Sequence, residues 1–269
     1  MDEQADALKA FKERQKDVWT YFAPLEALTT APAAKLVRHA RVRAGQRLLD
    51  VACGTGVVAV TAARAGANVS GIDITPSLVE HARVNAGTAG LTIDFREGDA
   101  EALPFDDRTF DAVLSQFGHM FAPRPAVAVS EMLRVLKPGG VLAFSTWPPE
   151  LFMGRIFALI GRYMPPPPID MPPPPLWGDP GVIRERLGDA VRDISFDRDR
   201  MLVPVLSPEH HLAMNQRTAG PVVKLVEMLA AKDPARLETF RTEYLALARD
   251  NFADNIIHCD FLLTRAIKR

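Results

Sequence analysis

Short apolar runs alternate with stretches of helical periodicity through the first half of the chain. The run at 46–51 (QRLLDV) is apolar and bounded by turn-forming residues, which is typical of a buried strand. Four further runs share this character, and the segments between them have apolar residues at helical spacing. We therefore expect strands at 46–51, 68–73, 92–97, 110–116 and 141–147, and helices at 57–65, 76–86 and 125–136. Strands separated in this way need right-handed crossovers, so the pattern predicts an α/β fold with a mostly parallel, doubly wound sheet.

The two flanks of this region predict further elements. Residues 2–21 have apolar side chains at helical spacing and end in an aromatic cluster, which fits either a helix packed on the domain edge or a lid. A short helix is expected at 32–40, and the Pro138-Gly139-Gly140 run is expected to end the helix at 125–136. Towards the end of the chain we expect a sixth strand at 191–203, a mostly helical stretch at 209–250 with a break near 220–221, and a final strand at 256–267.

Prolines crowd the segment between residues 148 and 180. A helix at 151–163 fits before the two four-proline runs, Pro165–Pro168 and Pro172–Pro175. Because proline fixes φ and lacks an N–H group, these runs are expected to be extended and neither helical nor part of a central strand. Three interpretations stay open: a stiff surface loop, a ligand for a proline-binding module, or a wall over a substrate site. The position directly after the fifth strand favours the wall.

A glycine turn links the first predicted strand to the next helix, in the sequence LLDVACGTG at 48–56. Gly54 and Gly56 allow positive φ and a close approach of the backbone to a ligand. The helix that follows presents free N–H groups and a positive dipole end, which favour a carboxylate or phosphate. In an open α/β sheet this turn lies at the carboxyl ends of the strands, where ligands bind. The turn therefore predicts a ligand site.

The glycine turn fits two kinds of ligand. Gly54-x-Gly56-x-x-Ala59 matches the dinucleotide fingerprint, and Asp73 lies ~20 residues further on, where an acid accepts hydrogen bonds from ribose hydroxyls. Asp73 also fits a helix cap, since the next helix starts within three residues. Asp50 favours a different ligand, because an acid at the end of the first strand can meet an ammonium group. Dinucleotides have no such group, whereas S-adenosylmethionine carries one.

Composition narrows the range of partners. The 269 residues are 48% hydrophobic and 24% charged, with a formal net charge of −1, which argues against broad electrostatic capture of nucleic acid or an anionic membrane. Cys53 and Cys259 imply no disulfide framework, and the histidines and cysteines show no metal-ligand spacing. A signal-peptide pattern and an apolar run of ~20 residues are both missing, so a cytoplasmic protein without a membrane span is expected. The oligomeric state stays open.

Three later motifs complete the pattern: 97–105 (EGDAEALPF), 110–113 (FDAV) and 133–140 (LRVLKPGG). In order and spacing, these segments and the glycine turn resemble the successive motifs of class I S-adenosylmethionine-dependent methyltransferases, most closely the ubiquinone/menaquinone-biosynthesis type. The resemblance covers about 48–147. It implies a Rossmann-like, seven-stranded sheet whose last strand is antiparallel, and S-adenosyl-L-methionine as the cofactor. One departure is Ala52, where the family commonly has glycine.

The resemblance also implies roles for single residues. Asp50 and the backbone of 52–56 would hold the methionine end of the cofactor, and Asp73 would hold the ribose hydroxyls. Asp99 would accept a hydrogen bond from the adenine amino group. The full set of predicted cofactor-binding residues is Asp50, Ala52, Cys53, Gly54, Thr55, Gly56, Asp73, Ile74, Asp99, Ala100, Glu101 and Gln116. We expect one domain over 1–269, with N-terminal helices or a lid at 1–40, a cofactor-binding core at 41–147, and insertions at 148–190 and 204–254 that cover the substrate.

The methyl acceptor is narrowed only by exclusion. Enzymes that methylate base amines or glutamine amides usually carry Asn/Asp-Pro-Pro-aromatic after the fourth strand, and this chain has SQFG at 115–118. Apolar insertions without a basic tract favour a small apolar or aromatic acceptor. His119 is the candidate general base, because its segment is expected to face the transferred methyl group, with His210 and His211 as alternatives. An NAD(P)-dependent oxidoreductase and a non-catalytic S-adenosylmethionine-binding protein are the competing interpretations.

Overall fold

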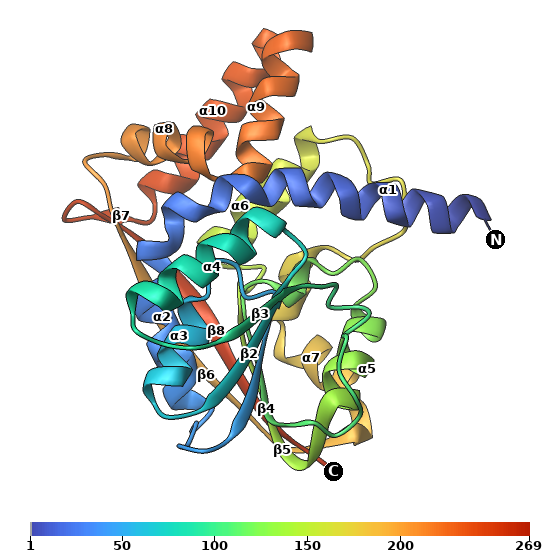
Figure 1. The fold of residues 1–269 in the computed structure, drawn as a ribbon. Coiled ribbons are helices and arrows are strands. Elements are labelled where there is room, and N and C mark those ends of the chain that lie inside the picture. Colours follow the sequence, from blue (N-terminus) through green and yellow to red (C-terminus); the bar gives the residue numbers. More distant parts are fainter. Residues whose placement is uncertain (1) are drawn as a thin grey trace.

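A mostly parallel β-sheet forms the centre of the protein, with helices on both faces and a further group of helices across one edge (Figure 1). The structure is a computed structural model that describes residues 2–269. The strand order is β3-β2-β1-β4-β5-β8-β6, and β8 is antiparallel to both of its neighbours, β5 and β6. The short strand β7 pairs with β8 outside this order. The predicted doubly wound sheet with an antiparallel last strand is confirmed.

The strands lie where the alternating pattern places them. Two of them have the predicted bounds, β2 (Asn68–Asp73) and β4 (Phe110–Gln116). The others differ from the prediction mainly at one end: β1 (Arg47–Val51), β3 (Asp94–Glu97), β5 (Leu136–Thr146), β6 (Val191–Pro204) and β8 (Ile256–Lys268), with β7 (Phe252–Ala253) additional. Consecutive residues of β1, such as Leu48 and Leu49, are both fully buried, because helices cover both faces of the central strands.

Helices form the two outer layers. On one face, α3 (Val57–Arg64) and α4 (Pro76–Thr88) pack against β1 to β4, and α2 (Glu26–His39) packs against β4, β5, β8 and β6. α5 (Pro125–Val135) and α7 (Pro180–Leu187) contact each other on the opposite face. Three short 3₁₀ turns connect these elements: η2 (His119–Phe121), η3 (Pro174–Gly178) and η4 (Gly188–Ala190).

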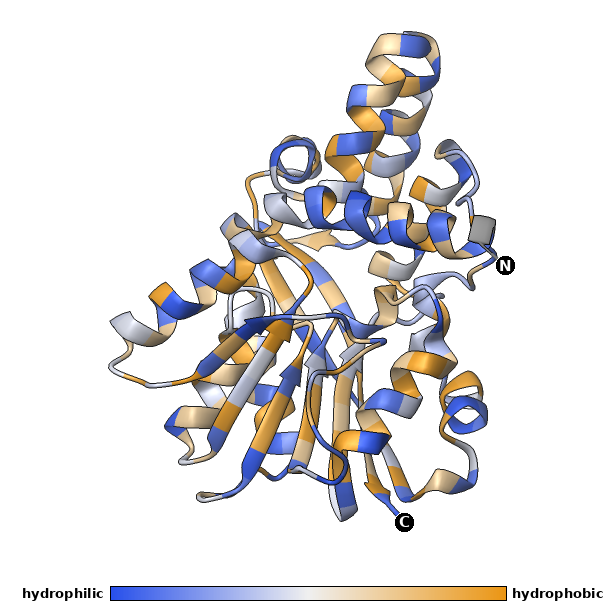
Figure 2. Cartoon of the chain, turned by 45° about the vertical axis from the view of Figure 1, so that its right-hand side comes forward, coloured by the Kyte–Doolittle hydropathy of each residue, from blue (hydrophilic) through white to orange (hydrophobic). Residues whose placement is uncertain are grey.

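The remaining helices gather at the carboxyl ends of the parallel strands. Figure 1 shows α1 crossing above the sheet, while α9 and α10 project away from it. This group consists of α1 (Asp2–Trp19), the 3₁₀ helix η1 (Thr20–Leu25), α6 (Phe152–Tyr163), α8 (Pro208–Thr218), α9 (Gly220–Lys232) and α10 (Pro234–Arg249). Hydrophilic and hydrophobic residues alternate along them (Figure 2). Within residues 2–269, no helix is both long and apolar enough to span a bilayer.

The predicted start of the second helix is wrong, and so is the role of the Pro138-Gly139-Gly140 run as a helix stop. α2 begins at Glu26, so Pro32 lies inside the helix, where it can donate no hydrogen bond. Burial of the helix face that includes Pro32 and Leu36 outweighs this loss. α5 ends at Val135, and the Pro138-Gly139-Gly140 run does not end a helix but forms an irregularity inside β5, between its pairings of Leu136 and Val141 with β4.

The proline-rich segment also departs from its prediction. Pro165–Pro168 is exposed and has no regular structure, as expected. The second run is not wholly extended, because Pro174 and Pro175 open the short 3₁₀ helix η3, whose first positions need no N–H donor. η3 buries Trp177 beside β5 and α6. Through η3, the segment therefore covers part of the β5 side of the protein.

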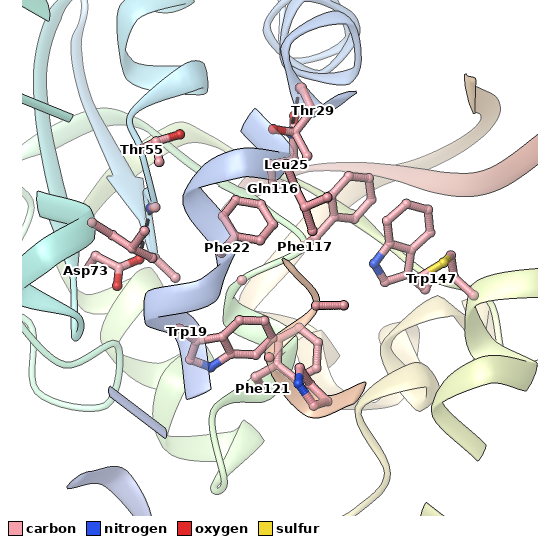
Figure 3. A pocket seen from close by; sticks show the side chains of 18 of the residues that line it. Trp19, Phe22, Leu25, Thr29, Thr55, Asp73, Gln116, Phe117, Phe121 and Trp147 are labelled. Carbon is pink, nitrogen blue, oxygen red and sulfur yellow. Dashed lines mark hydrogen bonds between the residues drawn. The ribbon is translucent and has the colours of Figure 1, made fainter. Parts of the chain in front are cut away.

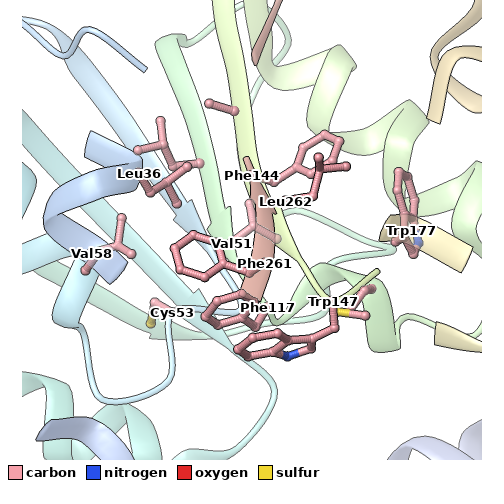
Figure 4. Close-up of a cluster of buried hydrophobic side chains, with 14 of the residues drawn as sticks. Leu36, Val51, Cys53, Val58, Phe117, Phe144, Trp147, Trp177, Phe261 and Leu262 are labelled. Atoms are coloured by element: carbon pink, nitrogen blue, oxygen red, sulfur yellow. The ribbon is translucent and has the colours of Figure 1, made fainter. Parts of the chain in front are cut away.

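The core continues from the sheet to the base of the helical group. Figure 4 shows Phe117 and Trp147, which follow β4 and β5, lying beside Phe261 of β8. The Phe117 and Trp147 rings stack with centroids 3.9 Å apart, and Phe261 meets Phe117 edge-on at 5.4 Å. Such aromatic pairs add to stability beyond the area they bury. This stack fixes the two loops that leave β4 and β5 at the carboxyl edge.

Candidate functional site

A cavity lies at the carboxyl edge of the sheet, beneath the helical group (Figure 3). Its floor is formed where β1, β2 and β4 end, at Asp50, Asp73 and Gln116. Its roof comes from α1, η1 and α6, and its far side from α8, α9 and α10. Ten of the predicted cofactor-binding residues line it: Asp50, Ala52, Cys53, Gly54, Thr55, Asp73, Ile74, Asp99, Ala100 and Gln116.

The glycine turn after β1 brings the backbone to the cavity. Ala52, Gly54 and Gly56 all have positive φ, at 54°, 54° and 81°. Gly56, which is predicted to bind the cofactor, does not line the cavity. It closes the turn by donating to the Cys53 carbonyl at 2.9 Å. A side chain there would meet Phe95 at 2.9 Å, so glycine is needed for packing. Of the first N–H groups of α3, which have no partner within the helix, that of Ala59 donates to Asp50 Oδ2 at 3.0 Å.

Ala52 adopts the left-handed conformation that its family position usually gives to glycine. A side chain at φ 54° carries backbone strain, and its Cβ has room because residue 118, on the facing loop, is glycine. A Cβ atom on Gly118 would lie 2.5 Å from the Cβ of Ala52. The departure at Ala52 is therefore matched by a small residue across the cavity floor.

Two buried carboxyl groups stand at the ends of β1 and β2. Asp73 accepts hydrogen bonds from the Gly54 N–H at 2.8 Å and the Thr75 N–H at 2.9 Å. Asp50 is 1% exposed; its Oδ2 accepts from the Ala59 N–H at 3.0 Å, while its Oδ1 has no partner within residues 2–269. Burial, reinforced by the nearby Asp73, raises the pKa of Asp50 well above its usual range. An unpartnered buried carboxyl group next to another acid would bind a cation favourably.

The third acidic position follows β3 and is joined to the N-terminal helix. Asp99 lines the cavity and accepts a hydrogen bond from Lys12 Nζ at 2.6 Å. Glu101 does not line the cavity, contrary to its prediction. It is buried, and its carboxylate contacts Lys12 at 2.6 Å and Arg124 at 2.8 Å. Its position makes Glu101 an anchor for α1, because the carboxylate is fully used by these two cations.

The side of the cavity next to the acids is polar at a few points and otherwise apolar. Gln116 donates from its amide nitrogen to the Thr29 carbonyl at 2.9 Å, and its oxygen has no partner among the described residues. Figure 3 shows Phe22 between the Asp73 and Phe117 sides of the pocket, with Trp19 beside Phe121. The Trp19 and Phe121 ring centroids are 4.6 Å apart. These aromatic side chains shield the cavity from water.

His119 was predicted to face the transferred methyl group, and the structure places it elsewhere. Its neighbours Phe117, Gly118 and Phe121 line the cavity, but His119 does not. The ring is 1% exposed and packs between Phe144 and Trp177, with centroid distances of 4.6 and 4.7 Å. The turn η2 directs this side chain into the core. In this arrangement His119 has no access to an acceptor, so we do not retain it as the base.

The burial of His119 predicts a loss of stability in acid. Burial lowers its pKa from 6.5 to about 3, so the folded protein binds fewer protons than the unfolded chain between these values. Stability is therefore fully present above pH 6.5 and falls as the pH decreases towards 3, by about 2 kcal/mol at pH 5. Urea unfolding at pH 8 and pH 5 should show this loss in the wild type and less of it in His119→Leu. The exposed His81→Leu is the control, and an equal loss in all three proteins would contradict the prediction.

Several lining residues lie outside the predicted set of cofactor-binding residues. They come from segments far from the glycine turn and include Trp19 and Phe22 near the N-terminus, Phe157 of α6, and His211 and Tyr244 of the C-terminal helices. Of these, the sequence predicts the aromatic cluster at 19–22 only as the end of a possible lid, and His211 only as an alternative base. The four-proline runs, predicted as a wall over the substrate, line none of the cavity, and the preceding helix α6 does so in their place. Among the described residues, no cluster of three metal-ligating side chains occurs.

Comparison with known proteins agrees with this geometry. Residues 49–144 match the family described as "Methyltransferase domain". The chain is 35% identical over 249 residues to the uncharacterized protein Rv1403c of Mycobacterium tuberculosis, covering 92% of this chain and 90% of that protein. It is 37% identical over 140 residues to demethylmenaquinone methyltransferase of Deinococcus radiodurans, covering 51% of this chain and 56% of that enzyme. The chain belongs to the class I S-adenosylmethionine-dependent methyltransferases.

A solved structure shows the same fold at low sequence identity. Phosphoethanolamine N-methyltransferase 2 of Haemonchus contortus, in complex with S-adenosyl-L-methionine, has a TM-score of 0.54 and 19% identity, over 88% of this chain and 52% of that one. As a member of this methyltransferase family, the chain uses S-adenosyl-L-methionine as its cofactor. The interpretation as a nicotinamide oxidoreductase, which the glycine turn alone left open, is not supported.

Proposed function

We propose that this methyltransferase acts on a small, apolar or aromatic acceptor. The observation that supports this most directly is the composition of the cavity, in which acidic groups are confined to the β1–β3 side. Away from them the lining consists largely of aromatic, methionine and aliphatic side chains: Trp19, Phe117, Phe121, Trp147, Met153, Ile156, Phe157, Ile160, Met201, Val203, Met214 and Val222. Such a lining favours an apolar ligand that loses its water on binding.

The cofactor fits the residues on the acidic side. The unpartnered Oδ1 of Asp50 is suited to the ammonium group of the methionine part, which would satisfy a buried carboxyl that has no protein cation. The turn at 52–56 brings backbone close to the cavity through its positive-φ residues. Asp73 would take the ribose hydroxyls and Asp99 the adenine amino group, with Ile74 and Ala100 beside the base.

The chain's own residues would perform the catalysis by orientation and exclusion of water. When bound, the cofactor supplies an electrophilic methyl group on a sulfonium, which a nucleophile displaces in line. Gln116, held by the Thr29 carbonyl, and the stacked Phe117 fix the floor between cofactor and acceptor. Well-oriented reactants lower a barrier by roughly 7–11 kcal/mol, so a rigid floor and an apolar roof account for much of the rate enhancement.

The N-terminal helix is proposed to act as a lid. Lys12, Gln15 and Trp19 of α1 line the cavity, and Lys12 contacts both Asp99 and Glu101 at 2.6 Å. We expect Lys12→Met to accelerate release of bound S-adenosylhomocysteine about tenfold, because charge-assisted hydrogen bonds of roughly 1.5–3 kcal/mol hold the helix down. Stopped-flow tryptophan fluorescence would measure the rate. Lys9→Met, an exposed position on the same helix, should release at the wild-type rate, and an unchanged rate in Lys12→Met would argue against the lid.

The function is tested first by calorimetric titration with S-adenosylmethionine, S-adenosylhomocysteine and NADH. Micromolar binding of the two sulfur nucleotides without NADH binding is the expected result. Release of S-adenosylhomocysteine is then followed with small phenols, hydroquinones and heterocycles, and with bulk protein and RNA, as acceptors. Turnover with small aromatic compounds supports the proposal. Turnover only with protein or RNA refutes the acceptor class, and NADH binding alone refutes the cofactor site.

A further inference from the structure

His211 and Tyr244 form a hydrogen-bonded pair in the lining of the cavity. His211 comes from α8 and Tyr244 from α10, and both are nearly inaccessible to bulk solvent, at 4% and 1% exposure. The Tyr244 hydroxyl lies 3.2 Å from His211 Nδ1. Met214 of α8 and Cys259 of β8 also line the cavity, and the rings of Phe152 and Phe240 lie 5.7 Å from His211 and 5.9 Å from Tyr244. β8 is three strands from β1 in the sheet, so this pair is separate from the acids that face the cofactor side.

The pair is neutral at physiological pH, and its geometry leaves one imidazole nitrogen able to accept a hydrogen bond from a ligand. Burial, with a smaller effect of His210, lowers the pKa of His211 to about 4, and burial together with Cys259 raises the pKa of Tyr244. Tyr244 therefore keeps its proton, and its oxygen can accept a hydrogen bond from the Nδ1–H group of the neutral His211 ring. In that tautomer Nε2 carries a lone pair, and it has no hydrogen-bond partner among the described residues. The hydrogen bond to Nδ1 fixes the orientation of the ring.

We propose that His211, positioned by Tyr244, binds a hydroxyl group of the acceptor and takes its proton during methyl transfer. The inference rests on the proposed function and narrows the acceptor to an apolar compound with an ionisable hydroxyl. The hydroxyl proton passes to Nε2, the oxygen forms the bond to the methyl carbon, and the electron pair of the broken carbon–sulfur bond stays on sulfur. His211 then returns its proton to water. A neutral amine would attack without prior loss of a proton, whereas a hydroxyl gains most from a base.

Two probes of matched shape test the pair without relying on turnover. In the presence of S-adenosylhomocysteine, the wild type is expected to bind 2-naphthol about tenfold more tightly than 2-methylnaphthalene, because one hydrogen bond to a buried partner is at stake. His211→Phe should abolish this preference, and Tyr244→Phe, which removes only the hydroxyl, should reduce it several-fold. The absorption of bound naphtholate should appear at a lower pH in the wild type than in His211→Phe. His81→Phe, at an exposed position of α4 outside the cavity lining, should behave as the wild type.

The outcomes separate this inference from the proposed function. Failure of the wild type to bind S-adenosylhomocysteine would refute the proposed function itself. Binding of S-adenosylhomocysteine with no preference for 2-naphthol in the wild type would overturn only the role of the pair. An unchanged preference and an unchanged naphtholate titration in His211→Phe would do the same. Thermal unfolding of each variant shows whether it is folded, and Tyr244→Phe keeps the test valid where His211→Phe is unstable.

Discussion

Replacing Asp73 with asparagine is expected to weaken the binding of S-adenosylhomocysteine by at least about 100-fold, or roughly 2.7 kcal/mol. The Asp73 carboxylate accepts from the Gly54 and Thr75 N–H groups at 2.8 and 2.9 Å, and it lines the cavity at the end of β2. An asparagine offers one oxygen in place of two, so its amide N–H₂ would face a backbone donor. Hydrogen bonds to charged groups contribute roughly 1.5–3 kcal/mol each. Calorimetric titration measures the loss.

The control and the unfolding data separate the two roles proposed for Asp73. Asp189→Asn, at an exposed position in η4, makes the same chemical change away from the cavity and should bind like the wild type. The alternative of a helix cap is partly realised, because Asp73 contacts the N–H of Thr75, the residue before α4. A purely structural role would lower the unfolding free energy and leave affinity within threefold of the wild type. That result would contradict the assignment of Asp73 to the cofactor.

The sheet could be predicted from the sequence because each strand is marked by residues that are neighbours in the chain. Each buried strand is a short apolar run between turn residues, and the glycines after β1, the acid that ends β2 and the acid after β3 lie where the alternation places strand ends. The structure brings Asp50, Asp73 and Asp99 to one cavity, since parallel strands present their carboxyl ends at the same edge. The role of these residues toward the cofactor stays a prediction.

The roof and the far side of the cavity could not be predicted in the same way. Trp19, His211 and Tyr244 come from helices whose apolar faces are equally compatible with packing anywhere on the domain. Their meeting over the sheet depends on tertiary contacts among α1, η1, α8, α9 and α10, for which the sequence has no local sign. Helical periodicity shows which face is buried but not which surface covers it.

The segment that contains His119 reaches the cavity as predicted, but the His119 side chain does not. The loop after β4 does reach the cavity, as expected for this position in the sheet, through Gln116, Phe117 and Gly118. The 3₁₀ turn η2 then turns His119 into the core, against Phe144 and Trp177. The sequence position of His119 next to the site therefore predicts its role less well than the apolar environment that buries its ring. Of the two histidines, His211 lines the cavity.

Gly118→Ala is expected to destabilise the protein by roughly 1–3 kcal/mol, the usual cost of overpacking, and to weaken cofactor binding with it. The φ of Gly118 is −94°, so its backbone accepts any residue and the effect is purely steric. The added Cβ would lie 2.5 Å from the Cβ of Ala52 and 2.8 Å from its carbonyl oxygen. Because Ala52 belongs to the glycine turn, relief of this clash has to move the part of the backbone proposed to hold the methionine end.

A second substitution identifies the cause. Ala52→Gly removes the closer of the two contacts and relieves a side chain held at φ 54°, so the Ala52→Gly/Gly118→Ala double variant should recover part of the lost stability and affinity. Recovery stays partial, since the contact with the backbone oxygen remains. Denaturant unfolding of the four proteins gives the coupling energy between the two positions, and a value near zero would contradict the steric account. A clear coupling would explain how this chain tolerates alanine where its family commonly has glycine.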